Sequence, residues 1–452
     1  MSIIAIPMCV LLALYSGPRA DVLSPQGYYA MAIQDVECLF EARTLESLEG
    51  MLLLVIYQLR SPSPPGIWSL VGMTMRHALS QGLHRKFHGP SVIDQRRKRI
   101  FWTTYMLERS IARTLGLPVS INDRDVDVSF PAAVSEDIDD EDNMSLALLQ
   151  DVPASPTSAV IHIYRLAQLE SKVYSSIYRV DRPLATDLSR KVARFRQLLD
   201  NWRSQISTVV PATSELEHIS PNSYVDHRYH NLHYHRVMLL LLLPNLTGMA
   251  PTNADFELCV SSAGQVVQLY KQLHDHQDML SYSLIALHAT FVAGLTLIYC
   301  FLASERAIFN PQFSSDVRAC STVLYVISER WPAARKVRDA FERMVSLTVE
   351  RGERGDTNNV GHRQPTGLPP SSSTNGQESA NYLWQELAAE MPGRRSQQDC
   401  TMPGDIFPDP NDFWSCLGPW LGDEAEGFGQ SWLDPVPAGH DPTFSLVHDS
   451  GL

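Results

Sequence analysis

The chain has 452 residues, of which 44% are hydrophobic, so it is long enough to bury a large core without disulfides or structural metals. Lys and Arg number 37 against 50 Asp and Glu, a formal net charge of −13. This charge repels a phosphate backbone unless cations gather on one surface, which argues against nucleic-acid binding by the whole chain. The 7 cysteines are scattered and form no Cys-x-x-Cys pair, which excludes a visible disulfide framework or structural zinc site.

The chain begins with an apolar segment, "SIIAIPMCVLLALYSG". No Lys or Arg precedes it, Pro7 interrupts it, and it is too short for a membrane span, which needs about 20 apolar residues. We therefore expect a core helix whose upstream part is missing, in an intracellular protein. The weaker alternative is a cleaved secretory signal.

Two segments with helical periodicity follow. "TLESLEGMLLLVIYQL" begins at Thr44, a plausible N-cap, and ends before "SPSPPG", which cannot continue a helix. "GIWSLVGMTMRHALSQGLHRK" carries an apolar stripe, then Gly82, which suits a left-handed C-cap, and Leu83, which can fold back on the last turn. Together they predict an antiparallel helix pair joined by a proline-rich turn.

The next stretch, "RRKRIFWTTYMLERSIARTLGLPVSINDRDVDVSFP", starts with four cations. We expect these to be the exposed, solvated first turn of a core helix; the alternative is an import signal or a phosphate-contacting patch. Aromatic residues then continue an apolar stripe, and Glu108 with Arg109 predicts a buried ion pair that orients neighbouring helices. Gly116 and Pro118 end the helix.

Two groups of residues have partial metal-binding patterns. Asp123, Asp125 and Asp127 have the spacing of a calcium loop, but Val128 and Val134 replace the required glycine and glutamate, so a turn is the better prediction. The second group consists of histidines, with no Cys or Glu spaced to complete a zinc site. We therefore expect these side chains on helix surfaces and at helix interfaces. The group contains His227, His230, His233 and His235. With no nucleophile elbow or phosphate cradle in the chain, we expect no metal site, no catalytic residue and no enzyme activity.

Helical periodicity continues downstream and strand patterns are scarce, which predicts an all-α fold. The acidic run "SEDIDDEDN" predicts a solvated loop between the two helical blocks. Further helices are expected at about 157–180, 184–207, 222–243, 254–275, 279–305 and 313–347.

After about residue 347 the chain becomes rich in Gly, Pro, Ser and Asn, which predicts a flexible tail with one short helix in "ANYLWQELAAEM". From residue 396 the tail lacks Lys and Arg and mixes acidic with aromatic residues, the composition of a transcriptional activation segment. The alternative is an ordered extension whose tryptophans pack on the helical domain. The candidate activation residues are Phe407, Phe413, Trp414, Leu417, Trp420, Leu421, Phe428 and Trp432.

In this order and spacing, "LYSG", "SLEGMLLLVIYQL", "IWSLVGMTMRHALSQGLHRK" and the stretch from Arg96 to Pro131 resemble a known family. It is the fungal-specific transcription factor family, in the regulatory "middle homology" domain of zinc-cluster (Zn2Cys6-type) regulators. Glu108 stands where the family usually has aspartate, and Leu117 where it has arginine. The signature positions, expected to be structural, are Gly82, Leu83, His84, Arg99, Trp102, Tyr105, Glu108, Arg109, Gly116, Pro118, Asp127 and Pro131.

The resemblance implies a helical regulatory domain over residues 1–347, with the core signature at 10–131, an acidic loop at about 132–157 and downstream helices at 158–347. A tail over 348–452, with the acidic-aromatic segment 396–452, completes the chain. It also implies a nuclear regulator of RNA polymerase II genes, of a metabolic or secondary-metabolite biosynthetic set. The family's N-terminal zinc cluster is absent from this sequence, so we expect no cofactor in this chain, with zinc only in a missing DNA-binding module.

The expected partners are the transcription machinery or co-regulators, a second copy of the chain and a small-molecule effector. DNA is expected to be contacted only indirectly or through the missing module, and no membrane is expected. The alternatives are a helical ligand- or metal-binding protein or enzyme, and a truncated product without activity.

Overall fold

The computed structural model describes residues 25–34, 36–60, 66–135, 137–149, 154–178, 185–210, 223–275, 283–304, 311–331 and 334–358. Within these ranges every regular element is a helix, which confirms the all-α prediction. The longer helices are α4 (Leu45–Arg60), α5 (Ile67–Ser80), α6 (Ser91–Leu115), α8 (Pro156–Ile177), α9 (Ala185–Ser204), α11 (His227–Leu246), α12 (Ala254–Asp275), α13 (Leu284–Ala303), α14 (Pro311–Arg330) and α15 (Ala334–Asn358). The short ones are α2 (Pro25–Ile33), α3 (Glu37–Glu41), η1 (Asp123–Asp125), α7 (Glu141–Leu148), α10 (Ile206–Val209) and η3 (Ser223–Val225).

The helix pair α4 and α5 begins and ends as its sequence predicts. Thr44 Oγ1 accepts from the Ser47 amide at 3.2 Å and so caps the N-terminus of α4. Gly82 has a φ of 69°, and the Leu83 amide donates to the Ala78 carbonyl at 3.0 Å, which closes the last turn of α5. The Gly82 and Leu83 predictions are therefore confirmed.

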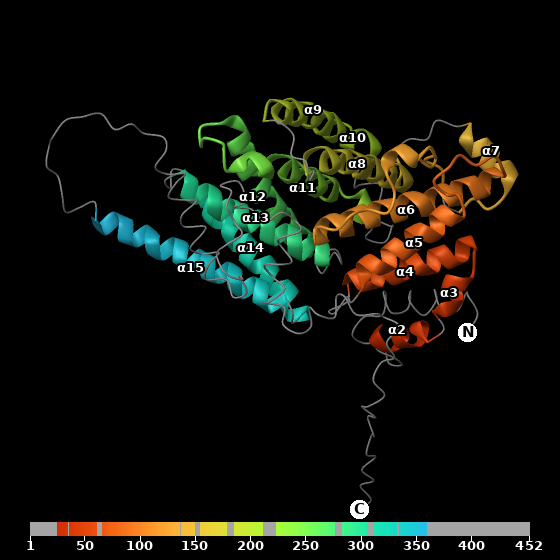
Figure 1. Cartoon of the computed structure of the whole chain (residues 1–452), viewed down its shortest axis with the longest axis horizontal. Helices are drawn as coiled ribbons and strands as arrows, with labels where there is room; N and C mark the ends of the chain where they lie inside the picture. Colours follow the sequence, from red (N-terminus) through yellow and green to blue (C-terminus); the bar gives the residue numbers. More distant parts are fainter. Residues whose placement is uncertain are drawn as a thin grey trace, which may run out of the picture.

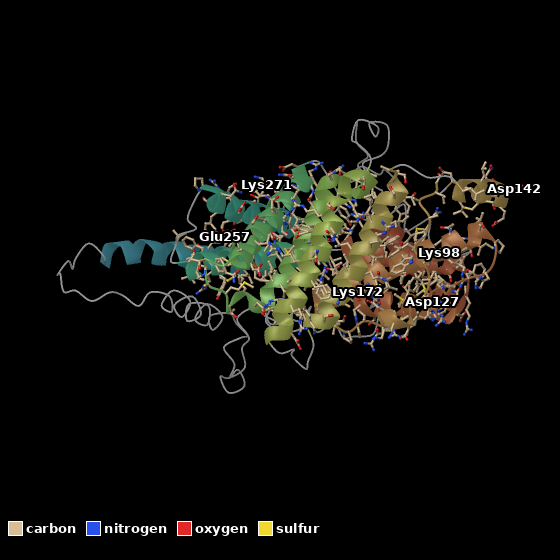
Figure 2. All side chains as sticks on the ribbon, turned by 90° about the horizontal axis from the view of Figure 1, so that it is seen from above. Lys98, Asp127, Asp142, Lys172, Glu257 and Lys271 are labelled. Atoms are coloured by element: carbon tan, nitrogen blue, oxygen red, sulfur yellow. The ribbon has the colours of Figure 1, made fainter. Side chains whose placement is uncertain are left out.

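The helices form one elongated body with a continuous hydrophobic core (Figure 1). Helices α2–α7 occupy one end, α12–α15 the other, and α8–α11 lie along one side between them (Figure 1). Figure 2 shows Lys98 and Asp127 at the first end, and Glu257 and Lys271 of α12 at the second. Helix α6 crosses the middle, where it contacts both α8 and α13.

Helix α13 is the central helix of the second end, and most of its residues are buried. It is long and apolar enough to cross a membrane, but in this structure 83% of its apolar window is buried against other helices, as in a core helix. A Cβ added at Gly294 would lie 2.5 Å from the Phe341 ring and 2.6 Å from Cys320 Sγ. Only glycine allows α14 and α15 to approach α13 this closely.

Several predicted boundaries were wrong. The helix expected at 313–347 is two helices, because α14 ends at Arg330 and α15 begins at Ala334, on either side of Pro332, which lacks a backbone donor. The helix expected at 184–207 ends at Ser204 before the separate turn α10, and α15 continues past residue 347 to Asn358. The helices expected at 157–180, 222–243, 254–275 and 279–305 are present as α8, α11, α12 and α13.

The acidic segment predicted as a solvated loop at about 132–157 contains helix α7. Asp140 caps this helix by accepting from the Asn143 amide at 2.8 Å. The carboxylate of Glu141 accepts from the amides of Ser91 and Val92, each at 2.8 Å, and so caps α6 as well. The negative charges therefore serve two helix N-termini, where the helix dipole favours them. The N-terminal apolar segment, the helix expected in "ANYLWQELAAEM" and the activation residues lie outside the described residues.

Candidate functional site

The loop after α6 folds back along that helix. Gly116 has a φ of 67°, and the Leu117 amide donates to the Ala112 carbonyl at 2.8 Å. Further along, the indole of Trp102 donates to the Ser129 carbonyl at 3.0 Å. The loop then contacts the end of α5, because the Asp127 amide donates to the His84 carbonyl at 3.1 Å. The signature residues of the two helices and the loop are thus brought together in one substructure.

Two more signature residues, Pro118 and Pro131, lie at the edges of this substructure. The indole of Trp68 donates to the carbonyl of Pro118 at 3.4 Å, which ties the chain after α6 to α5. Pro131 is buried, and Phe130 beside it packs against Trp102 with ring centroids 4.3 Å apart. The sequence pattern therefore marks contacts between α5, α6 and the loop.

A buried ion network lies beneath the loop. Arg109 pairs with Glu108 at 2.7 Å and with Asp123 at 3.0 Å, and it also donates to the Ile121 carbonyl at 2.8 Å. The other oxygen of Glu108 accepts from the Ser120 amide at 2.8 Å, and the Tyr105 hydroxyl donates to Asp123 at 2.7 Å. The predicted ion pair is present, but it ties the loop to α6 and does not orient neighbouring helices.

The four cations at residues 96–99 are not the solvated first turn that the sequence predicted. Helix α6 begins earlier, at Ser91, and all four side chains are half-buried. Their hydrogen bonds to neighbouring groups fix α6 against α4, α5 and the following loop, so this stretch is not a free basic patch. The pairs are Arg96 with Glu46 and Glu49, Arg97 with the Gln81 carbonyl, Lys98 with Asp94, and Arg99 with the Val134 and Ser135 carbonyls.

Two of the three alternating aspartates bind neighbouring groups of the protein itself. Asp123 belongs to the ion network, and Asp127 accepts from the Lys86 amide at 2.9 Å and pairs with Arg85 at 3.1 Å. Among the described residues, no group of three or more His, Cys, Asp or Glu is arranged to hold a metal ion.

The histidines of α11 point to different helices. His230 contacts the Tyr224 carbonyl at 2.8 Å, and His235 contacts Ser262 of α12 at 3.3 Å. Burial lowers the pKa of each to about 4, so both are neutral at physiological pH. They are packing residues at helix interfaces, which is the interpretation that the sequence favoured over a zinc site.

Residues 7–204 match the model of the fungal specific transcription factor domain. The chain carries a fungal specific transcription factor domain. Similar proteins include an uncharacterized transcriptional regulatory protein of Saccharomyces cerevisiae, 26% identical over 72% of this chain and 25% of the relative. A second is the pyrimidine pathway regulatory protein 1 of the same yeast, which is 25% identical over 65% of this chain and 33% of the relative. A third is the positive regulator of purine utilization of Emericella nidulans, which is 24% identical over 72% of this chain and 38% of the relative. The chain thus spans about a quarter to two fifths of these relatives, and no solved structure matches it.

The structure reveals a second group of polar residues that sequence reasoning missed. Arg113, in the last turn of α6, forms an ion pair with Glu170 of α8, both within the fungal transcription factor domain. Arg236 and His233 of α11 and His288 of α13 lie beside them, from the part of the chain beyond that domain. We call these five residues, with Tyr270 of α12, the central cluster.

Burial is the main cause of the pKa shifts in the central cluster, and its arginines add to them. Burial, followed by the positive charges of Arg113 and Arg236, lowers the pKa of His288 to about 3. The pKa of His233 is lowered by burial and then by Arg236 in the same way. No spacing in the sequence marks this group, because Arg113 and Arg236 stand on helices far apart in the chain.

Proposed function

We propose that the chain acts as a transcription regulator in the nucleus, controlling RNA polymerase II genes of a metabolic or biosynthetic set. The observation that carries this proposal is the fungal transcription factor domain at residues 7–204, with its signature residues joined into one folded substructure. The pyrimidine and purine regulators among the relatives support a metabolic gene set. Because the sequence contains no Cys-x-x-Cys pair, DNA recognition comes from a zinc-cluster module outside it or from a partner protein.

In this proposal the helical domain presents the acidic-aromatic segment 396–452 to co-regulators or the transcription machinery. Acidic side chains keep the aromatic ones accessible to water, so that a partner groove can capture them. A non-enzymatic role is supported by relatives that are named as regulators. A homodimer would place two such segments on one promoter and is part of the same proposal.

The activation role is tested by tethering the chain to DNA through an unrelated DNA-binding domain and measuring a reporter gene. Removal of residues 396–452 should abolish activation, and changing Trp414, Trp420 and Trp432 together to alanine should reduce it strongly. Removal of residues 359–395 instead, which keeps the acidic-aromatic segment, is the matched control and should retain activation. Full activity without residues 396–452 would exclude this role.

A further inference from the structure

Helix α7 lies at one end of the elongated molecule, where Figure 2 shows Asp142. It has 8 residues, of which only Met144 is buried. The carboxylate of Glu141 joins it to the first turn of α6 through the amides of Ser91 and Val92. A helix of two turns is only marginally stable without tertiary packing. Because one side chain alone anchors α7 in the core, most of its surface faces solvent.

The end of α7 exposes large apolar side chains. Leu146 is 57% and Leu149 is 85% exposed, and Leu148 is exposed as well. Ile93, in the first turn of α6 that Glu141 caps, is a fourth. These four are half of the 8 large hydrophobic residues that are exposed in the described part of the chain. Because single exposed residues are normal but a gathered group marks an interaction site, this end of the molecule is a contact surface for a partner.

An open groove of about 410 Å³ lies between α7 and the loop before it. Its lining includes three aspartates, Asp137, Asp139 and Asp140, together with the apolar residues Leu146 and Ala147. We call this surface the α7 groove. Charged and apolar groups meet there in one concave place, which is what a groove needs to bind an amphipathic peptide.

The aspartates of the α7 groove are not neutralised by cations of the chain itself. Residues 125–164 contain no Lys or Arg. Arg99, which binds the start of this segment, donates to two backbone carbonyls. Asp137 accepts from a neutral serine hydroxyl, and neither Asp137 nor Asp139 forms an ion pair with a described residue. The groove therefore carries negative charge that a partner can neutralise.

We propose that the α7 groove binds a basic amphipathic segment of a partner protein, with Lys or Arg side chains against the aspartates and large apolar side chains against Leu146 and Leu149. Opposite charges steer such a segment to the groove and fix its orientation. Burial of the leucines adds affinity, and the contact stabilises α7 because it adds the packing that this helix lacks.

The charge of the chain itself favours a second protein as the occupant. Segment 396–452 contains no Lys or Arg and many acidic residues, so like charges would repel it from the α7 groove. In residues 359–395 three arginines are matched by three glutamates, which leaves no net positive charge. This surface is therefore additional to the acidic-aromatic segment and does not depend on its activation role.

Binding is tested with the full chain of 452 residues and three labelled model peptides, by fluorescence anisotropy at physiological ionic strength. The first peptide is an amphipathic helix of Lys, Leu and Ala. The second has Glu in place of every Lys, and the third has Ser in place of every Leu. The first should bind about tenfold more tightly than either of the others, because only it offers both cations and apolar side chains. Its binding should protect the amides of α7, and not those of α12, from hydrogen exchange.

The charge of the groove is tested by Asp137→Asn combined with Asp139→Asn, which leaves both helix caps of this region in place. Binding of the first peptide should weaken by about tenfold or more, because two attractive charges are lost. The matched control is Glu257→Gln combined with Asp275→Asn, which removes two exposed charges from α12 at the other end of the molecule (Figure 2). It should change binding by less than about twofold, because such distant charges are screened.

The apolar part of the groove is tested by Leu146→Ser, which should weaken binding of the first peptide by about fivefold or more. The matched control is Val349→Ser on α15, because Val349 is 56% exposed and Leu146 is 57% exposed. It should leave binding unchanged. Since all of the altered side chains are exposed, each variant should unfold within about 2 °C of the wild-type midpoint.

The proposal is overturned if the first peptide binds no better than the other two. It is also overturned if either groove variant loses no more affinity than its matched control, which would show general attraction by a chain of net charge −13. Dissociation of a dimer by Leu146→Ser but not by Val349→Ser, measured by sedimentation, would overturn it too, because the groove would then hold a second copy.

The tethered reporter assay separates this surface from the proposed function. A wild-type chain that binds the first peptide but drives no reporter would contradict the proposed function alone. A wild-type chain that drives the reporter but does not bind the peptide would contradict the α7 groove alone.

Discussion

Arg109 and Arg113 lie one turn apart on the same helix, yet their surroundings differ. Arg109 is 4% exposed and has two carboxylates, a carbonyl and the Tyr105 ring, which lies 3.5 Å from its guanidinium carbon, as neighbours. Arg113 pairs with a single carboxylate, that of Glu170, and feels the charge of a second arginine. Its side chain is 11% exposed, which is more than that of Arg109. The first network is closed and holds a loop in place. The second is covered less completely by the surrounding helices.

Removal of the charge at Arg109 should cause the largest loss in the free energy of unfolding. Arg109→Met leaves Glu108 and Asp123 without their cation, so the free energy of unfolding should fall by about 3–5 kcal/mol. Urea unfolding followed by circular dichroism measures the change. A loss below about 1 kcal/mol for Arg109→Met would show that the closed network does not stabilise the fold.

The buried histidines outside the central cluster should make stability depend on pH. Burial, followed by the charge of His230, lowers the pKa of His162 to about 4, and its ring stacks on Trp202 at 4.3 Å. Between the unfolded pKa of about 6.5 and this value only the unfolded chain takes up the proton, so stability is full above about pH 6.5 and is lost as the pH falls.

His162→Phe keeps an aromatic ring in this place but cannot titrate. It should reduce the slope of the free energy of unfolding against pH by up to about 1.4 kcal/mol per pH unit between pH 6.5 and 4. The measurement is urea unfolding at several pH values. An unchanged slope would mean that His162 is not the group that titrates on unfolding.

A cap shared between two segments should have a smaller effect. Glu141→Ala removes the carboxylate that accepts from the Ser91 and Val92 amides, so the free energy of unfolding should fall by about 0.5–2 kcal/mol. Hydrogen exchange of the first turn of α6 should increase at the same time. If that turn keeps its protection in the variant, the acidic run does not stabilise α6.

The smallest effect is expected for a pair on the surface. Arg190 and Asp187 form an ion pair on α9, with the Arg190 side chain 80% exposed. Arg190→Gln should change the free energy of unfolding by less than about 0.5 kcal/mol, as judged by urea unfolding. A loss comparable to that of Arg109→Met would mean that burial does not separate the two kinds of ion pair.

Local chemistry decided which parts of the fold could be predicted from the sequence. Thr44, Gly82 and Gly116 act on their own helix ends, so their roles are visible within a few residues. The roles of Glu141 and of the cations at residues 96–99 were missed because their partners are distant in sequence, as in the pair of Arg96 with Glu49 at 2.7 Å. A charged residue with no partner nearby in the sequence is predicted to be exposed, because only the fold shows a distant partner.

The central cluster could not be predicted because it has no spacing signature. Arg113, Arg236 and His288 come from three helices far apart in the chain, and each alone fits an ordinary helix surface. Only the packing of α6, α11 and α13 brings them together. The signature network was easier to anticipate, because Tyr105, Glu108 and Asp123 lie close together in the chain.

The packing of α6 on α13 also sets where the protein can be divided. The domain match ends at residue 204, but the hydrophobic core runs without interruption from Ala32 in α2 to Met344 in α15. A fragment cut at that boundary would carry α4, α6 and α8 with their apolar faces open to water, a surface that drives aggregation. The segment that the family model matches is therefore shorter than the segment that folds as one unit. Expression of the helical domain should extend through α15.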